Sequence, residues 1–135
     1  MARMAGEKGL VWAVDIQEEM LGLAGKAAEK EGVLPRIRFH RGKGNSLDLD
    51  LPPVFSFVLI FHVLHETADQ EKILGDIFRI LGPGGLLLLA EPKGIIGEKE
   101  FQNSIELALK AGFAMKDQPS ILLSRAVLLE KAQRP

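Results

Sequence analysis

An acidic residue closes the first apolar segment of the chain, residues 10–14. Asp15 follows this Leu-Val-Trp-Ala-Val run directly, just before a helical pattern that begins at Gln17. A carboxylate at a strand-to-helix corner can accept hydrogen bonds from both hydroxyls of a ribose, as in nucleotide-binding α/β folds. It can equally cap the next helix, because Glu18 stands three residues later, as in a capping box. The local sequence leaves both interpretations of Asp15 open.

A second group of polar side chains follows the most apolar segment, residues 54–61. His62, His65 and Glu66 come directly after it. In an open parallel sheet, ligands bind outside the carboxyl ends of the strands, so these residues would line a pocket. A metal site is disfavoured, because the spacing is not H-E-x-x-H and His40 is the only other histidine. The alternative is a purely structural role, in which His65 and Glu66 hydrogen-bond to loop backbone.

A charged pair follows the next apolar segment, residues 86–90. Glu91 and Lys93 stand on either side of a proline. Because the carboxyl ends of parallel strands share one edge of a sheet, this pair would lie at the same rim as the histidines. Taken alone, the two residues predict an ion pair on the surface.

Composition narrows the class of protein. The chain of 135 residues, with 47% apolar and 26% charged residues, is typical of one soluble globular domain spanning residues 1–135. Its net charge of -1 argues against a general affinity for nucleic acid or an anionic membrane. No membrane-spanning or signal-peptide pattern is present, so the cytoplasm is expected. Zero Cys and zero Tyr exclude thiol nucleophiles, thiolate metal sites and phenol acid–base chemistry.

Hydrophobic periodicity predicts six strands and three helices, and residues 1–9 look like the tail of a further helix. Strands are expected at residues 10–14, 36–40, 54–61, 86–90, 113–116 and 121–129. Helices are expected at residues 17–30, from a capping box at Thr67 to Leu81, and at 98–111, where Gly112 would end the last one. A glycine-rich turn at residues 82–85 would follow the second helix.

Alternating strands and helices predict an α/β fold with a mostly parallel sheet covered by helices on both faces. The strand at residues 54–61 is expected to be central, because it is apolar on both faces. The short connection through Pro119 favours a C-terminal antiparallel hairpin.

These landmarks together resemble a class I S-adenosylmethionine-dependent methyltransferase of the small-molecule type (methyltransferase type 11, UbiE-like), which has a Rossmann-like fold. The ordered set covers nearly the whole chain, although each motif is short. The matching segments are Val-Trp-Ala-Val-Asp-Ile (11–16), Phe-Ser-Phe-Val-Leu (55–59), Val-Leu-His-Glu (63–66), Arg-Ile-Leu-Gly-Pro-Gly-Gly (79–85), Leu-Leu-Ala-Glu-Pro (88–92) and Gly-Phe (112–113).

The resemblance implies eight contacts with the cofactor S-adenosylmethionine. Asp15 would bind the ribose hydroxyls, and Ile16 would lie against the adenine. The other six would line the adenine edge (Asn45, Ser46 and Leu47) and the floor beneath the cofactor (Phe61, His62 and Val63).

The same resemblance places the methyl acceptor, a small molecule and neither nucleic acid nor membrane, beside His65 and Glu66. Methyl transfer is an in-line displacement, so the protein mainly positions the reactants and can supply a base. His65 is the candidate base.

The chain also departs from the family pattern. The family's first strand and its glycine-rich cofactor loop would lie before Met1, so an N-terminally truncated domain is expected. Ser56 stands where the family commonly has Asp, and Gly82 where Lys is usual. The missing strand would be central, between residues 10–14 and 54–61. One of three outcomes is expected: direct pairing of these two strands, completion by another chain such as a second copy, or marginal stability.

A second function from another class follows from the same gap. An open sheet can recruit a partner strand, so a non-catalytic interaction or scaffold protein is the alternative to an active enzyme.

Overall fold

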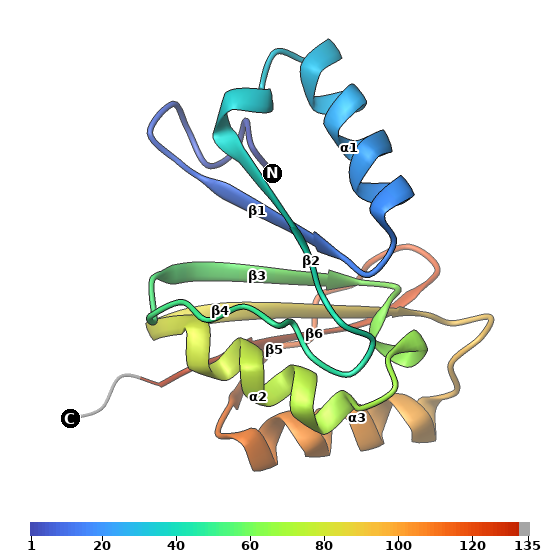
Figure 1. Ribbon diagram of the computed structural model, residues 1–135. Helices are drawn as coiled ribbons and strands as arrows, with labels where there is room; N and C mark the ends of the chain where they lie inside the picture. Colours follow the sequence, from blue (N-terminus) through green and yellow to red (C-terminus); the bar gives the residue numbers. More distant parts are fainter. Residues whose placement is uncertain (133–135) are drawn as a thin grey trace. The chain divides into compact units, whose positions relative to one another are not determined.

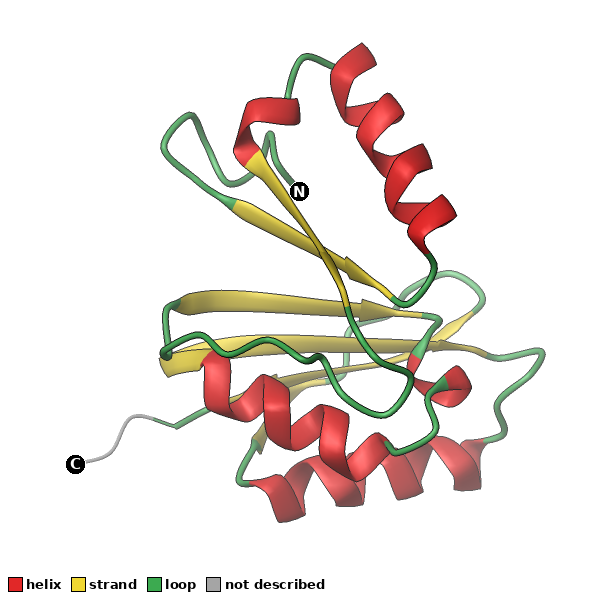
Figure 2. Ribbon diagram, in the orientation of Figure 1, coloured by secondary structure: helices red, strands yellow, loops and turns green. Residues whose placement is uncertain are grey.

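Strands and helices alternate along residues 1–132, the part of the chain that the computed structural model describes (Figures 1 and 2). This order confirms the predicted alternation, with shifts at the ends of the segments. The strands are β1 (Val11–Asp15), β2 (Ile37–Arg41), β3 (Phe55–Phe61), β4 (Leu81–Pro92), β5 (Ala114–Asp117) and β6 (Ser124–Glu130). The α-helices are α1 (Glu18–Lys30), α2 (Gln70–Ile80) and α3 (Glu98–Ala111), and the short 3₁₀ helices are η1 (Leu34–Arg36) and η2 (Leu64–Glu66).

The chain forms two compact units that meet in sequence between Leu49 and Asp50. Unit 1 contains β1, α1, η1 and β2, and unit 2 contains all the later elements. The structure describes each unit by itself. That residues 1–135 act as one domain therefore stays a prediction.

In unit 1, β1 and β2 pair in parallel, from Val11 beside Ile37 to Asp15 beside Arg41. Helix α1 packs against both strands. Because the pairing continues to the last residue of each strand, Asp15 lies at the carboxyl edge of this small sheet. The apolar core of the unit consists of Ala2, Ala28 and Val33, packed with Val11 and Ile37.

Residues 1–9 form turns, so the predicted helix tail is wrong. The segment makes one helix-like turn, in which Ala5 N donates to Met1 O at 2.9 Å. Gly6 then adopts φ +81°, a left-handed conformation that ends the turn. The Arg36 guanidinium of η1 donates to Gly6 O at 3.0 Å and to Ala2 O at 3.3 Å. The guanidinium of Arg36, about thirty residues later in the chain, therefore holds this segment, and no continuous helix forms.

Unit 2 contains a four-stranded sheet in the order β3-β4-β6-β5. The pairing of β3 with β4 is parallel, and β4–β6 and β6–β5 are antiparallel, which confirms the predicted C-terminal hairpin. Helices α2 and α3 lie side by side on one face of this sheet (Figure 2). The strand residues facing the core of unit 2 have no exposed surface: Leu87, Leu89, Val127 and Leu129.

The strand expected to be central, β3, is instead at the edge of its sheet. It pairs with β4 alone, and Phe57, Leu59 and Phe61 are 39%, 37% and 47% exposed. β1 likewise pairs with β2 in the sheet of unit 1, and direct pairing of β1 with β3, which belong to different units, stays a prediction. Apolar character on both faces is typical of a central strand, but it does not specify which neighbours a strand acquires.

The N-terminus of α2 differs from its prediction by two residues. The cap is Asp69, whose Oδ1 accepts a hydrogen bond from Lys72 N at 3.0 Å. The predicted cap, Thr67, donates through Oγ1 to Leu64 O at 2.8 Å and closes η2 instead. The intervening 3₁₀ turn moves the start of the helix to a residue that is an equally good cap.

The other end of α2 runs directly into β4. Gly84 adopts φ +78°, and the pairing with β3 shifts register between Phe55 and Phe57, so the glycine run forms an irregular start of the strand rather than a separate turn. Lys131 Nζ donates to Phe78 O and Leu81 O, each at 2.7 Å. This cation satisfies carbonyl groups that the helix end leaves without partners.

Helix α3 matches its prediction at both ends. Gly112 adopts φ +118° at its C-cap, as the sequence predicts. A Cβ atom there would lie 2.7 Å from Cζ of Phe78, whose ring packs edge-on against Phe113 at 5.1 Å. On the same helix, Lys110 Nζ pairs with Glu71 of α2 at 2.8 Å, and this hydrogen bond and the charge of Glu71 raise the pKa of Lys110.

We therefore predict that Gly112→Ala lowers the free energy of unfolding by about 1–3 kcal/mol, because it combines left-handed strain with a clash against Phe78. The matched control is Gly75→Ala inside α2, where nothing lies within 4 Å of the new methyl group. This control should raise stability by roughly 0.5–1 kcal/mol through helix propensity. Urea unfolding of both variants measures the effects, and equal midpoints for Gly112→Ala and the wild type would contradict the assignment.

Candidate functional site

Asp15 is fixed at the corner between β1 and α1. Its Oδ1 accepts a hydrogen bond from Gln17 N at 2.8 Å, and its carbonyl oxygen accepts one from Gly42 N at 3.0 Å. The predicted capping box with Glu18 is wrong: Gln17 is the N-cap and makes no side-chain cap bond. The second carboxylate oxygen of Asp15 has no hydrogen-bond partner among residues 1–132. One oxygen thus orients the carboxylate, and the other is available to a ligand.

The neighbouring backbone is held by β2. Arg41 Nε donates to Ile16 O at 3.0 Å, and the same guanidinium lies 3.7 Å from Glu18. The Ile16 side chain is 50% exposed. An apolar surface therefore stands directly beside the Asp15 carboxylate.

The loop after β2 brings the predicted residues 45–47 into the same unit as Asp15. Lys43 and Ser46 exchange backbone hydrogen bonds at 2.9 and 3.2 Å, which closes a tight turn around Asn45. His40 Nε2 then contacts Leu47 O at 3.0 Å. Since this loop starts at the residue that donates to Asp15 O, the structure brings together all five cofactor residues predicted in this half of the chain.

The end of β3 carries the second predicted group. His62 adopts φ +61°, its N donates to Ala90 O at 2.8 Å, and its ring stacks on Phe61 with a centroid separation of 4.0 Å. His62 Nε2 and Ser124 Oγ are 2.7 Å apart, so this side chain joins the end of β3 to the start of β6. Phe61 and Val63 are 47% and 48% exposed. His62 is therefore held by hydrogen bonds, and its two neighbours present apolar surface.

The sequence predicted Glu91 at the surface in an ion pair, and this prediction is wrong. It is 1% exposed, and the expected surface pair with Lys93 is absent. Its carboxylate accepts hydrogen bonds from Leu64 N at 3.2 Å and from His65 N at 3.0 Å, and its Oε2 is 2.9 Å from His65 Nδ1. The signal available in the sequence was alternation, because Glu91 continues the buried series of Leu87 and Leu89 along β4.

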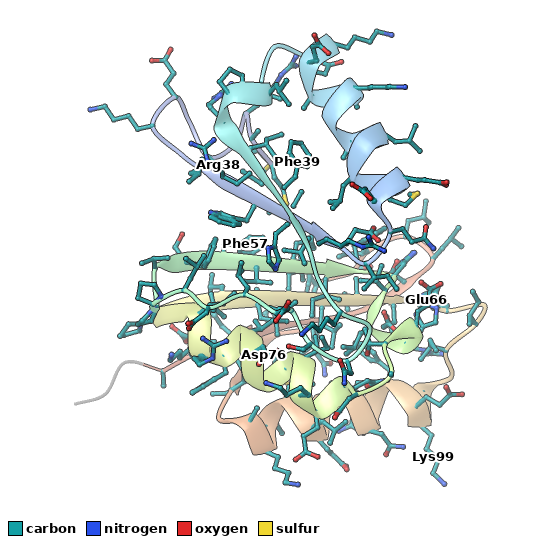
Figure 3. All side chains as sticks on the ribbon, viewed as in Figure 1. Arg38, Phe39, Phe57, Glu66, Asp76 and Lys99 are labelled. Atoms are coloured by element: carbon teal, nitrogen blue, oxygen red, sulfur yellow. The ribbon has the colours of Figure 1, made fainter. Side chains whose placement is uncertain are left out.

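His65 and Glu66 have unlike surroundings. The His65 side chain is 15% exposed and bonds to a carboxylate rather than to loop backbone, whereas the Glu66 side chain is 71% exposed. Figure 3 shows Glu66 on the η2 segment, between β3 and α2. Its Oε1 lies 3.8 Å from His65 Nε2. A histidine that is oriented by a carboxylate is suited to proton transfer.

Two other kinds of site find no support in the part of the chain that is described. No group of three His, Cys, Asp or Glu side chains there could hold a metal ion. Nor does any described helix combine the length and the apolar character needed to cross a membrane.

A family model described as a methyltransferase domain matches residues 1–89. Among curated proteins, the ubiquinone/menaquinone biosynthesis C-methyltransferase UbiE of Vibrio vulnificus is 33% identical over 91 residues, which are 67% of this chain and 34% of that protein. The Vibrio cholerae protein of the same name is 34% identical over the same shares. The chain thus spans about a third of the length of these relatives.

Solved structures extend the likeness to the whole fold. A SAM-dependent methyltransferase from Aquifex aeolicus gives a TM-score of 0.81 at 22% identity, over 97% of this chain and 73% of that one. The [4+2]-cyclase SpnF gives 0.78 at 15%, over 98% and 70%, and an arsenic(III) S-adenosylmethionine methyltransferase from Chlamydomonas reinhardtii gives 0.72 at 21%, over 99% and 58%. The chain belongs to the methyltransferase domain family, as its sequence predicts, and has the Rossmann-like α/β fold of that family.

Proposed function

We propose that this chain binds S-adenosylmethionine and takes part in methyl transfer to a small-molecule acceptor. The observation that carries the proposal is the Asp15 corner, where a strand-end carboxylate keeps one oxygen available next to exposed apolar surface at Ile16. These are the groups that a ribose and an adenine require. Family membership over residues 1–89 and the names of the solved relatives support the same cofactor.

Five of the predicted cofactor residues have a role in this proposal. Asp15 accepts from the ribose hydroxyls, Ile16 lies against the adenine, and the loop with Asn45, Ser46 and Leu47 borders the adenine edge. Contacts of Phe61, His62 and Val63 with the cofactor stay a prediction.

When bound, S-adenosylmethionine supplies a methyl group on a positively charged sulfur. Asp15 and Ile16 would hold its ribose and adenine, and the bound cofactor would supply the methyl group to the acceptor's nucleophilic atom. In this proposal, the acceptor's proton passes to Nε2 of His65, and exposed Glu66 faces the acceptor. The protein's larger contribution is to hold the reactants in line.

We predict that Asp15→Asn weakens binding of S-adenosylhomocysteine by about ten- to a hundredfold. The amide keeps an oxygen for Gln17 N but loses the charge and the second acceptor, and hydrogen bonds to charged groups contribute about 1.5–3 kcal/mol. Asp117→Asn is the matched control, because Asp117 also accepts one backbone hydrogen bond, from Gln118 N at 2.8 Å, and lies in β5 of unit 2. Isothermal titration calorimetry measures both. The cofactor proposal fails if the wild type does not bind at millimolar concentration.

A second candidate function is favoured by the edge of β3. This strand, Phe-Ser-Phe-Val-Leu-Ile-Phe, contains no charge and no proline, the residues that usually protect an edge from pairing with another chain. We propose a second copy of the chain as the partner. Antiparallel pairing of β3 with itself would make a two-fold symmetric contact through the backbone and would set the exposed Phe57 and Leu59 beside the side chains of the second copy.

This candidate predicts a concentration-dependent dimer that Leu59→Lys abolishes, because a charge on an edge strand opposes pairing. Leu122→Lys is the control, since Leu122 is 87% exposed but lies outside every strand. Sedimentation velocity distinguishes the cases. A wild-type chain that stays monomeric at high concentration rules out the second candidate and leaves the cofactor proposal untouched.

A further inference from the structure

Glu91 is a buried carboxylate whose partners are all hydrogen-bond donors. It is 1% exposed, and among residues 1–132 its ion-pair partner is His65 rather than a lysine or arginine. Oε1 accepts from Leu64 N at 3.2 Å, and Oε2 accepts from His65 N at 3.0 Å. Nδ1 of the His65 ring lies 2.9 Å from the same Oε2. A carboxylate without exposure needs such partners, because an unpaired buried charge is strongly unfavourable.

The chemistry of these groups fixes the position of one proton. Backbone N–H groups can only donate, and an ionised carboxylate can only accept. The contact between Nδ1 and Oε2 must therefore be donated by an Nδ1–H group. A neutral imidazole has one N–H, so the lone pair of the ring is on Nε2.

We propose that Glu91 is the positioning residue of His65. It holds the ring in the Nδ1–H tautomer and leaves Nε2 as the atom that can take up a proton. Nε2 has no hydrogen-bond partner in the described residues, and Glu66 Oε1 is 3.8 Å away. The use of Nε2 as a catalytic base rests on the proposed function, whereas the tautomer follows from this contact alone.

The same carboxylate also sets where the ring lies. By accepting from Leu64 N and His65 N, Glu91 ties the first residues of η2 to the end of β4. Strand β4 is the interior strand with the most buried side chains. The position of the His65 ring is therefore fixed relative to this buried strand of unit 2. A residue that only supported the η2 turn would influence stability and leave the tautomer unchanged.

Glu91→Leu separates these two roles. Leucine is of similar size but presents no acceptor to the three donors. The Nδ1–H group of the ring then loses the acceptor that requires its proton to stay on Nδ1. The variant should therefore lose the single Nδ1–H tautomer of His65 and populate the Nε2–H form.

The experiment is a two-bond ¹H–¹⁵N correlation spectrum of the full chain with ¹⁵N-labelled histidine, at about pH 8.5, two units above the usual histidine pKa of about 6.5. We expect Nδ1–H alone for His65 in the wild type and a clearly populated Nε2–H form in Glu91→Leu, a change in the tautomer ratio of about tenfold or more. Glu66→Gln is the control and should leave the wild-type pattern. Because the chain has three histidines, the variants His40→Asn and His62→Asn, which each remove one signal, assign the spectrum.

Two results would overturn the proposal: an Nε2–H tautomer in the wild type, or an unchanged Nδ1–H tautomer in Glu91→Leu. If Glu91→Leu does not fold, the wild-type spectrum alone decides. A separate assay with methyl-labelled S-adenosylmethionine tests the function. Should His65→Gln retain full methyl transfer while the wild-type tautomer is Nδ1–H, the base role is wrong and the positioning role stands.

Discussion

The site in unit 2 depends on one constraint, the need to satisfy a buried carboxylate. Glu91 continues the buried face of β4, where Leu87 and Leu89 have no exposed surface, so its charge has no access to water. The chain meets this need with two backbone N–H groups and one imidazole from the segment after β3. The position of η2, the orientation of His65 and the exposure of Glu66 all follow from that arrangement.

Local signals predicted much of the fold. The Gly112 cap and the bounds of α3 needed only an amphipathic pattern and a glycine, and the Asp15 corner needed only an apolar run that ends in an acid. Long-range partners caused the errors. Arg36 holds residues 1–9 in turns. The residues of β3 do not by themselves specify which strands pair with it. Glu91 was misplaced because its three donors come from a segment more than twenty residues earlier in the chain.

Fold and function separate among the solved structures that resemble this chain. The chain shares its architecture both with proteins named as methyltransferases and with one named as a [4+2]-cyclase, at TM-scores of 0.81 and 0.78. Architecture therefore does not select the reaction, which depends on the groups that a site presents. The groups that we propose for this chain are the second carboxylate oxygen of Asp15 and Nε2 of His65, and each lies at the carboxyl end of a strand or shortly after it.

The two proposed functions use different parts of β3. As part of a binding site, the strand must present Phe61 and His62 at its end, and the left-handed backbone of His62 is held there by Ala90 O and Ser124 Oγ. As a docking edge, it must present its backbone along its whole length. The hydrogen bonds of His62 lie beyond the last residue of β3, so an added strand could pair along residues 55–61 without disturbing them. The strand can therefore serve both purposes, and the site at its end does not require the edge to stay open.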